Sequence, residues 1–175
     1  IVNPTITPKT DTESNVLNLG FKALGLDGDD SANGTVEEGL GNVNVANFET
    51  LNITTGGDTA KKANNLEDLT ATKATTINIS GDAALTLDAL SGGALTKLDA
   101  SGLDAALTVT LEGDKVAITG AKKSSTYNFA ATLDNNDSVV GGAGTADEVT
   151  ATFGSVAEAA GTLNISGVET ITLTN

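Results

Sequence analysis

Short runs of alternating apolar and polar residues recur along this chain, and each run ends at a glycine. These glycines are Gly56, Gly81, Gly102, Gly120, Gly141 and Gly167, at intervals of 25, 21, 18, 21 and 26 residues. A second alternating run follows most of them, for example AALTLD after Gly81 and VETITLT after Gly167. Alternation with a period of two, in residues rich in Thr, Ile and Val, predicts β-strands.

The length of the repeat indicates the architecture. Two short strands in roughly 22 residues are typical of one coil of a solenoid, because a single coil buries its apolar side only against neighbouring coils. We therefore expect an all-β fold, a parallel β-solenoid of the β-helix or β-roll kind with coils of roughly 22 residues. A β-sandwich is the alternative, since its strands also follow one another at short, regular spacing.

The alternation also predicts which side chains face the core. The expected inward residues are Leu51, Ile53, Ile77, Ile79, Leu85, Leu87, Leu98, Leu107, Val109 and Ile118, and the same phase includes Ile171 and Leu173 in the last run. A slip of one residue would turn every side chain to the other face. The burial of these residues is therefore a direct test of the predicted register.

Three parts are expected along the chain. Residues 1–15 contain both prolines and predict an extended N-terminal arm or linker. Residues 16–44 are expected to form an entry segment with an acidic loop, and residues 45–175 the coils of the solenoid. Within the last part, residues 58–69 also allow a helical turn inserted between coils.

Composition narrows the possible functions. The chain has 23 Asp and Glu residues against 9 Lys and no Arg, which gives a net charge of −14. This charge argues against nucleic acid as a partner, because phosphates would be repelled. No apolar run is long enough to predict a membrane span. The chain also lacks His and Cys, which are frequent general bases and nucleophiles, so we do not expect an enzyme.

Residues 134–149, DNNDSVVGGAGTADEV, contain the sharpest local motif. Their glycines, followed by an acidic and then an apolar residue, match the order of the calcium-binding nonapeptide G-G-x-G-x-D-x-U-x with one residue inserted. Calcium takes six to eight oxygen ligands, which such turns supply from carboxylates and carbonyls. The candidate ligands are Asp134, Asp137 and Asp147. The alternative is an acidic, glycine-rich turn without a metal.

Residues 26–39, LDGDDSANGTVEEG, form a second candidate. Asp29, Ser31, Asn33 and Gly34 match the beginning of a calcium loop, but Leu40 stands where the closing glutamate belongs. A relaxed site would use Asp27, Asp29 and Asn33. The alternative is a solvated acidic loop.

Thr-x-Thr pairs occur at residues 70/72, 108/110, 150/152 and 172/174. A flat face of threonines would suit binding to ice. However, the intervals of 38, 42 and 22 residues do not place one pair in every coil. The high β-propensity of threonine explains these pairs without a ligand.

The phrases FETLNIT (48–54), TTINISGDAALTLDALSGGALTKLDASG (75–102) and TLNISGVETITLTN (162–175) resemble bacterial surface-layer proteins and RTX-type adhesins exported by type I secretion. The resemblance implies a secreted protein at the bacterial cell surface that binds Ca²⁺. It implies a self-assembling surface-layer or filament subunit, whose copies join through their chain ends. The alternative that it implies is a calcium-binding adhesin module that contacts a host, a surface or a cell-surface glycan.

Overall fold

The computed structural model describes residues 4–22, 41–56, 63–113, 115–152 and 162–175. Every regular element in these ranges is a β-strand. The strands are β1 (Thr5–Ile6), β2 (Val16–Lys22), β3 (Val43–Val45), β4 (Thr50–Gly56), β5 (Asn64–Ala71), β6 (Thr76–Gly81), β7 (Leu85–Ser91), β8 (Lys97–Leu103), β9 (Leu107–Leu111), β10 (Ala117–Thr119), β11 (Thr126–Asn128), β12 (Ser138–Val140), β13 (Glu148–Thr152), β14 (Asn164–Ser166) and β15 (Thr170–Thr174).

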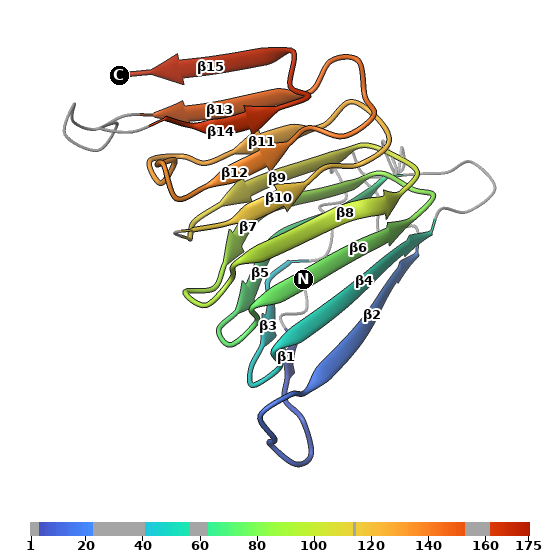
Figure 1. Cartoon of the computed structure of the whole chain (residues 1–175). Coiled ribbons are helices and arrows are strands. Elements are labelled where there is room, and N and C mark those ends of the chain that lie inside the picture. The colour runs from blue at the N-terminus through green and yellow to red at the C-terminus, as the bar shows by residue number, and fades with distance from the viewer. Residues whose placement is uncertain (1–3, 23–40, 57–62, 114, 153–161) are drawn as a thin grey trace, which may run out of the picture.

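The strands alternate between two sheets as the chain advances, so that each coil contributes one strand to each sheet (Figure 1). Sheet A has the order β1-β3-β5-β7-β9-β11-β13-β15, and sheet B has the order β14-β12-β10-β8-β6-β4-β2. Neighbouring strands pair in parallel throughout, as in the pairs β8–β10 and β10–β12. This topology confirms the parallel β-solenoid and excludes the sandwich, whose sheets are antiparallel.

The core is a stack of aliphatic side chains between the two sheets. All ten residues expected to face inward from 51 to 118 are at most 2% exposed. One column of sheet B runs through Leu17, Leu51, Ile77, Leu98, Ile118, Val139 and Ile165. Like therefore stacks on like from coil to coil, so most of the core is built from short aliphatic side chains.

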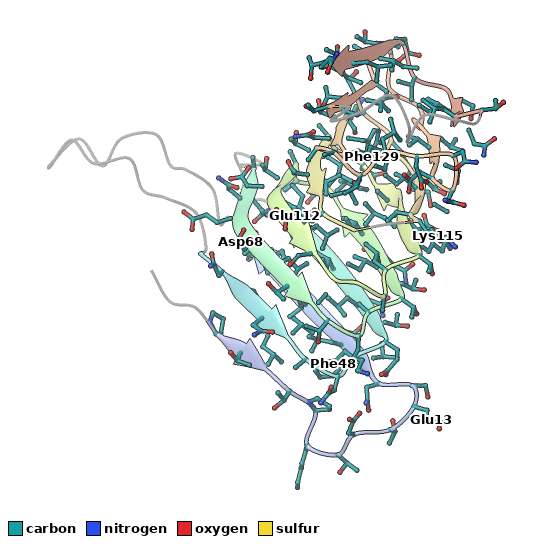
Figure 2. All side chains as sticks on the ribbon, turned by 90° about the vertical axis from the view of Figure 1, so that its left-hand side faces the viewer. Glu13, Phe48, Asp68, Glu112, Lys115 and Phe129 are labelled. Carbon is teal, nitrogen blue, oxygen red and sulfur yellow. The ribbon has the colours of Figure 1, made fainter. Side chains whose placement is uncertain are left out.

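Aromatic residues add to this core near both ends of the stack. Phe48 is 7% exposed and Phe129 is fully buried, and Figure 2 shows them far apart along the stack. Tyr127 is also fully buried, and its hydroxyl donates to the carbonyl of Gly141 at 2.9 Å. Burial raises the pKa of this phenol.

Ile171 and Leu173 have the predicted inward register, but neither is buried. Both have the inward register, since they pair with the buried Val149 and Ala151. However, they are 47% and 49% exposed. The reason is that β15 is the outermost described strand of sheet A, so none of the described coils covers it.

Three of the glycines that end the predicted runs stack on one another. Gly120, Gly141 and Gly167 follow paired strands of sheet B in the same register. A Cβ atom on Gly120 would lie 1.8 Å from the carbonyl oxygen of Gly141, and one on Gly141 would lie 1.8 Å from that of Gly167. Side chains are excluded here because the turns of successive coils approach so closely.

The ladder also includes strands that precede residue 45. β1 pairs with β3 and β2 pairs with β4, so parts of 1–15 and 16–44 belong to the two sheets. β5 begins at Asn64, within the stretch that also allowed a helical turn. None of the described residues forms a helix of the length and apolarity that a membrane crossing requires.

Candidate functional site

The position directly before the strands of sheet A carries a relay of hydrogen bonds. Ser125, Asp147 and Glu169 directly precede β11, β13 and β15, and Leu107, the first residue of β9, has the same register. The N–H of Leu107 donates to Ser125 Oγ at 3.1 Å, and the N–H of Ser125 donates to Asp147 Oδ1 at 2.7 Å. The N–H of Asp147 donates in turn to Glu169 Oε2 at 2.8 Å. Each coil therefore supplies the acceptor for a backbone donor of the coil before it.

Asp147 is the most constrained member of this relay. It is fully buried, and its second oxygen, Oδ2, has no hydrogen-bond partner. Burial raises the pKa of this carboxyl, and the neighbouring Glu169 carboxylate raises it further. A carboxylate that is desolvated and next to a like charge favours its protonated form.

The corresponding position of sheet B holds Asp137, which is 1% exposed. Its Oδ1 accepts from the N–H of Val116 at 2.8 Å, and its Oδ2 accepts from the N–H of Asp134 at 2.9 Å. Asp134 accepts from the N–H and from the side-chain amide of Asn136, and these bonds lower the pKa of its carboxyl. Both aspartates therefore organise the turn before β12 through backbone donors.

The structure brings Asp134 and Asp137 together but not with Asp147. Asp137 precedes β12 of sheet B, whereas Asp147 precedes β13 of sheet A, so they lie at opposite turns of one coil. In the part of the chain that the structure describes, no group of three or more acidic residues is placed to hold a metal ion. The three aspartates do not fit one shared calcium site. Asp27, Asp29 and Asn33 lie outside the described residues.

Sequence reasoning missed Ser125, Glu169 and Glu49 as partners in the turns. Glu49 also lies directly before a strand, and its Oε2 accepts from the N–H of Asn15 at 2.6 Å in the preceding coil. A signal was present, because each of these residues has a side-chain oxygen and directly precedes an alternating run. Finding it required the pairing of coils that are 18 to 34 residues apart.

The outer edge of β15 is the second candidate site. The strand is exposed along its whole length, and its apolar residues Ile171 and Leu173 lie in line with the core. The exposed edge of a strand presents backbone N–H and C=O groups that a further strand can pair with. This edge therefore offers both hydrogen-bonding groups and an apolar surface to an additional strand.

No protein-family model matches the chain, and neither a curated protein nor a solved structure matches it significantly.

Proposed function

We propose that this chain is a structural subunit that assembles end to end outside the bacterial cell, in a filament or a surface layer. One observation carries the proposal. Ile171 and Leu173 continue the core register of Val149 and Ala151 but are about half exposed. Burying such apolar side chains stabilises an assembly by about 25 cal/mol for each Å² removed from water.

The opposite end of the stack offers the complementary surface. β1 is the outermost described strand of sheet A there, and β2 is the outermost of sheet B. Leu17 and Leu19 of β2 pack only partly against the core. In the assembly, β15 of one copy pairs with β1 of the next copy, and β14 pairs with β2. Such a contact joins two different surfaces and does not close on itself, so it produces filaments.

We propose that the subunit binds calcium because the sequence resembles surface-layer and RTX-type proteins. A chain of net charge −14 repels its own copies, and bound cations reduce that repulsion. Asp137 engages backbone donors through both of its oxygens, and Asp147 does so through one. We therefore assign calcium binding to the stretch that contains Asp27, Asp29 and Asn33.

The test compares two substitutions of equal charge at equally exposed residues. Ile171→Glu places a carboxylate on the proposed contact, whereas Val140→Glu changes an outward residue of β12 that is 48% exposed. Electron microscopy and sedimentation in calcium should show filaments for the unmodified chain and for Val140→Glu, and none for Ile171→Glu. Equal assembly of the two variants would exclude the β15 edge as the contact.

The adhesin module is the alternative outcome of the same experiment. A chain that stays monomeric with and without calcium would favour a module that binds a host, a surface or a glycan. Among the described residues the aromatic side chains, Phe21, Phe48, Tyr127 and Phe129, are all buried, so none of them is available to stack on a sugar ring.

A further inference from the structure

The outward side of β9, β11, β13 and β15 is almost entirely threonine. We call these ten positions the threonine face: Thr108, Thr110, Thr126, Asn128, Glu148, Thr150, Thr152, Thr170, Thr172 and Thr174. They alternate with inward residues that are buried in β9, β11 and β13. Eight of the ten are threonine, so the face has one repeated side chain.

The pairing of the strands aligns these residues in columns. One column contains Thr108, Thr126, Glu148 and Thr170, and a second contains Thr110, Asn128, Thr150 and Thr172. The uneven intervals in the sequence do not disturb this register, because turns of different length absorb them. As the spacing indicated, not every coil has a Thr-x-Thr pair, since β11 presents Thr126 and Asn128, but the columns continue through this coil.

Hydrogen bonds between coils fix part of the face. Thr152 Oγ1 and Thr174 Oγ1 are 3.0 Å apart, and Thr172 Oγ1 donates to Glu148 Oε1 at 2.9 Å. Threonine is also restricted at χ1. A surface built this way loses little side-chain entropy when it is covered, in contrast to one of Lys, Gln or Glu.

The face is also nearly uncharged in a strongly acidic chain. Glu148 is the single charged residue among its ten positions, and it accepts a hydrogen bond from Thr172. The N-terminal half of the same sheet presents Glu67, Asp68 and Asp88, none of which is buried. Two copies of net charge −14 therefore repel each other less where their threonine faces approach than where the N-terminal halves of sheet A approach.

We propose that the threonine face is a lateral contact between two copies of this chain, packed face to face about a twofold axis. The inference rests on the proposed function: end-to-end contacts alone give single filaments, and this second contact joins two filaments into a pair. Identical short side chains in stacked rows suit such packing, because they interdigitate closely and exclude water. Thr–Thr pairs across the contact add hydrogen bonds.

The experiment uses two double variants with the same change of charge. Thr108→Glu with Thr152→Glu places carboxylates at two exposed positions of the threonine face. The control, Ala117→Glu with Val140→Glu, places them at exposed outward positions of sheet B. Electron microscopy should show paired filaments for the unmodified chain and the control, and single filaments for the threonine-face variant. Paired filaments in all three proteins would overturn the proposal.

A solution measurement separates this contact from end-to-end assembly. In the Ile171→Glu background, sedimentation velocity should show dimers, and adding the two threonine-face substitutions should shift them to monomers. This result would support the lateral contact even if the unmodified chain formed no filaments. The absence of filaments would then contradict only the proposed end-to-end assembly. The lateral contact would be overturned if the dimers persisted after the two threonine-face substitutions. It would also be overturned if the Ile171→Glu protein were monomeric at all concentrations. If a monomeric chain were incorporated into growing ice, the threonine face would be an ice-binding surface, and the proposed contact between two copies would be overturned.

Discussion

The N–H of Ser125 donates to Oδ1 of Asp147, which lies 22 residues later in the sequence and directly above it in the stack. The bond joins two coils at the turn, where the sheet ladder has not yet begun. Asp137 forms the equivalent bond to Val116 at the opposite turn. Carboxylates that resemble calcium ligands in the sequence thus hold adjacent coils together.

Asp137→Ala should lower the free energy of unfolding more than the loss of an ordinary surface carboxylate. The substitution leaves the N–H groups of Val116 and Asp134 without their acceptor, at a cost of about 1–3 kcal/mol for each group that stays buried. Urea unfolding measures the effect, with the exposed Asp82→Ala as a control expected within about 0.5 kcal/mol of the unmodified chain. Similar midpoints for the two variants would contradict this role.

Asp147 should make stability fall as the pH rises. The pKa of its carboxyl is raised above the ordinary value of 3.8, so the folded state binds this proton more tightly than the unfolded state. Its favourable contribution is complete below pH 3.8 and is lost as the pH rises through the raised pKa.

Asp147→Asn removes this titration and keeps an acceptor for Ser125. The stability of the unmodified chain minus that of the variant should therefore decline with increasing pH in urea unfolding from acid to neutral pH. A difference that stays constant over this range would show that Asp147 has an ordinary pKa.

Gly141→Ala should be strongly destabilising. The new Cβ would lie 1.8 Å from the carbonyl oxygen of Gly167, so the two turns must separate. Overpacking of this kind costs about 1–3 kcal/mol. Gly93 provides the matched control, since a Cβ there meets nothing within 4 Å. Thermal unfolding should separate the two variants, and equal melting temperatures would refute the close approach of the glycines.

Ile79→Ala and Ile171→Ala should lower the free energy of unfolding by different amounts, although both residues have the inward register. Ile79 is 1% exposed, so its truncation should cost about 2–4 kcal/mol through lost burial and the cavity left behind. Ile171 is 47% exposed in the single chain and should cost less than about 1 kcal/mol under dilute conditions. A large cost at Ile171 at low protein concentration would mean that it is already covered.

Calcium binding should be abolished by Asp29→Asn and retained in Asp147→Asn. The reason is that Asp147 is buried and caps a backbone donor, whereas Asp29 belongs to the sequence that begins like a calcium loop. Isothermal titration of both variants with calcium measures this. Loss of the binding heat in Asp147→Asn would show that calcium binds at the turn before β13.

Periodicity in the sequence was enough to predict stacked coils and most of the residues that form the core. Alternation identified Ile77 and Leu107 as inward, and the interval between glycines predicted stacked coils. Both inferences depend on local patterns with a period of two residues or one coil. The roles of Ser125 and Glu169 could not be obtained in this way, because their partners are set by which coils are neighbours.

By itself, the sequence determined an all-β chain with an aliphatic core and a strong negative charge. It favoured a parallel β-solenoid over a sandwich, because a single coil of this length buries its apolar side only against neighbouring coils. The tertiary structure decided the register between coils. That register aligns Thr108 with Thr126 across an interval of 18 residues, directs Asp137 and Asp147 to opposite turns, and leaves Ile171 exposed in line with the core. Turns of unequal length absorb the irregular spacing, so contacts between coils depend on the stacked backbone and not on distance along the chain.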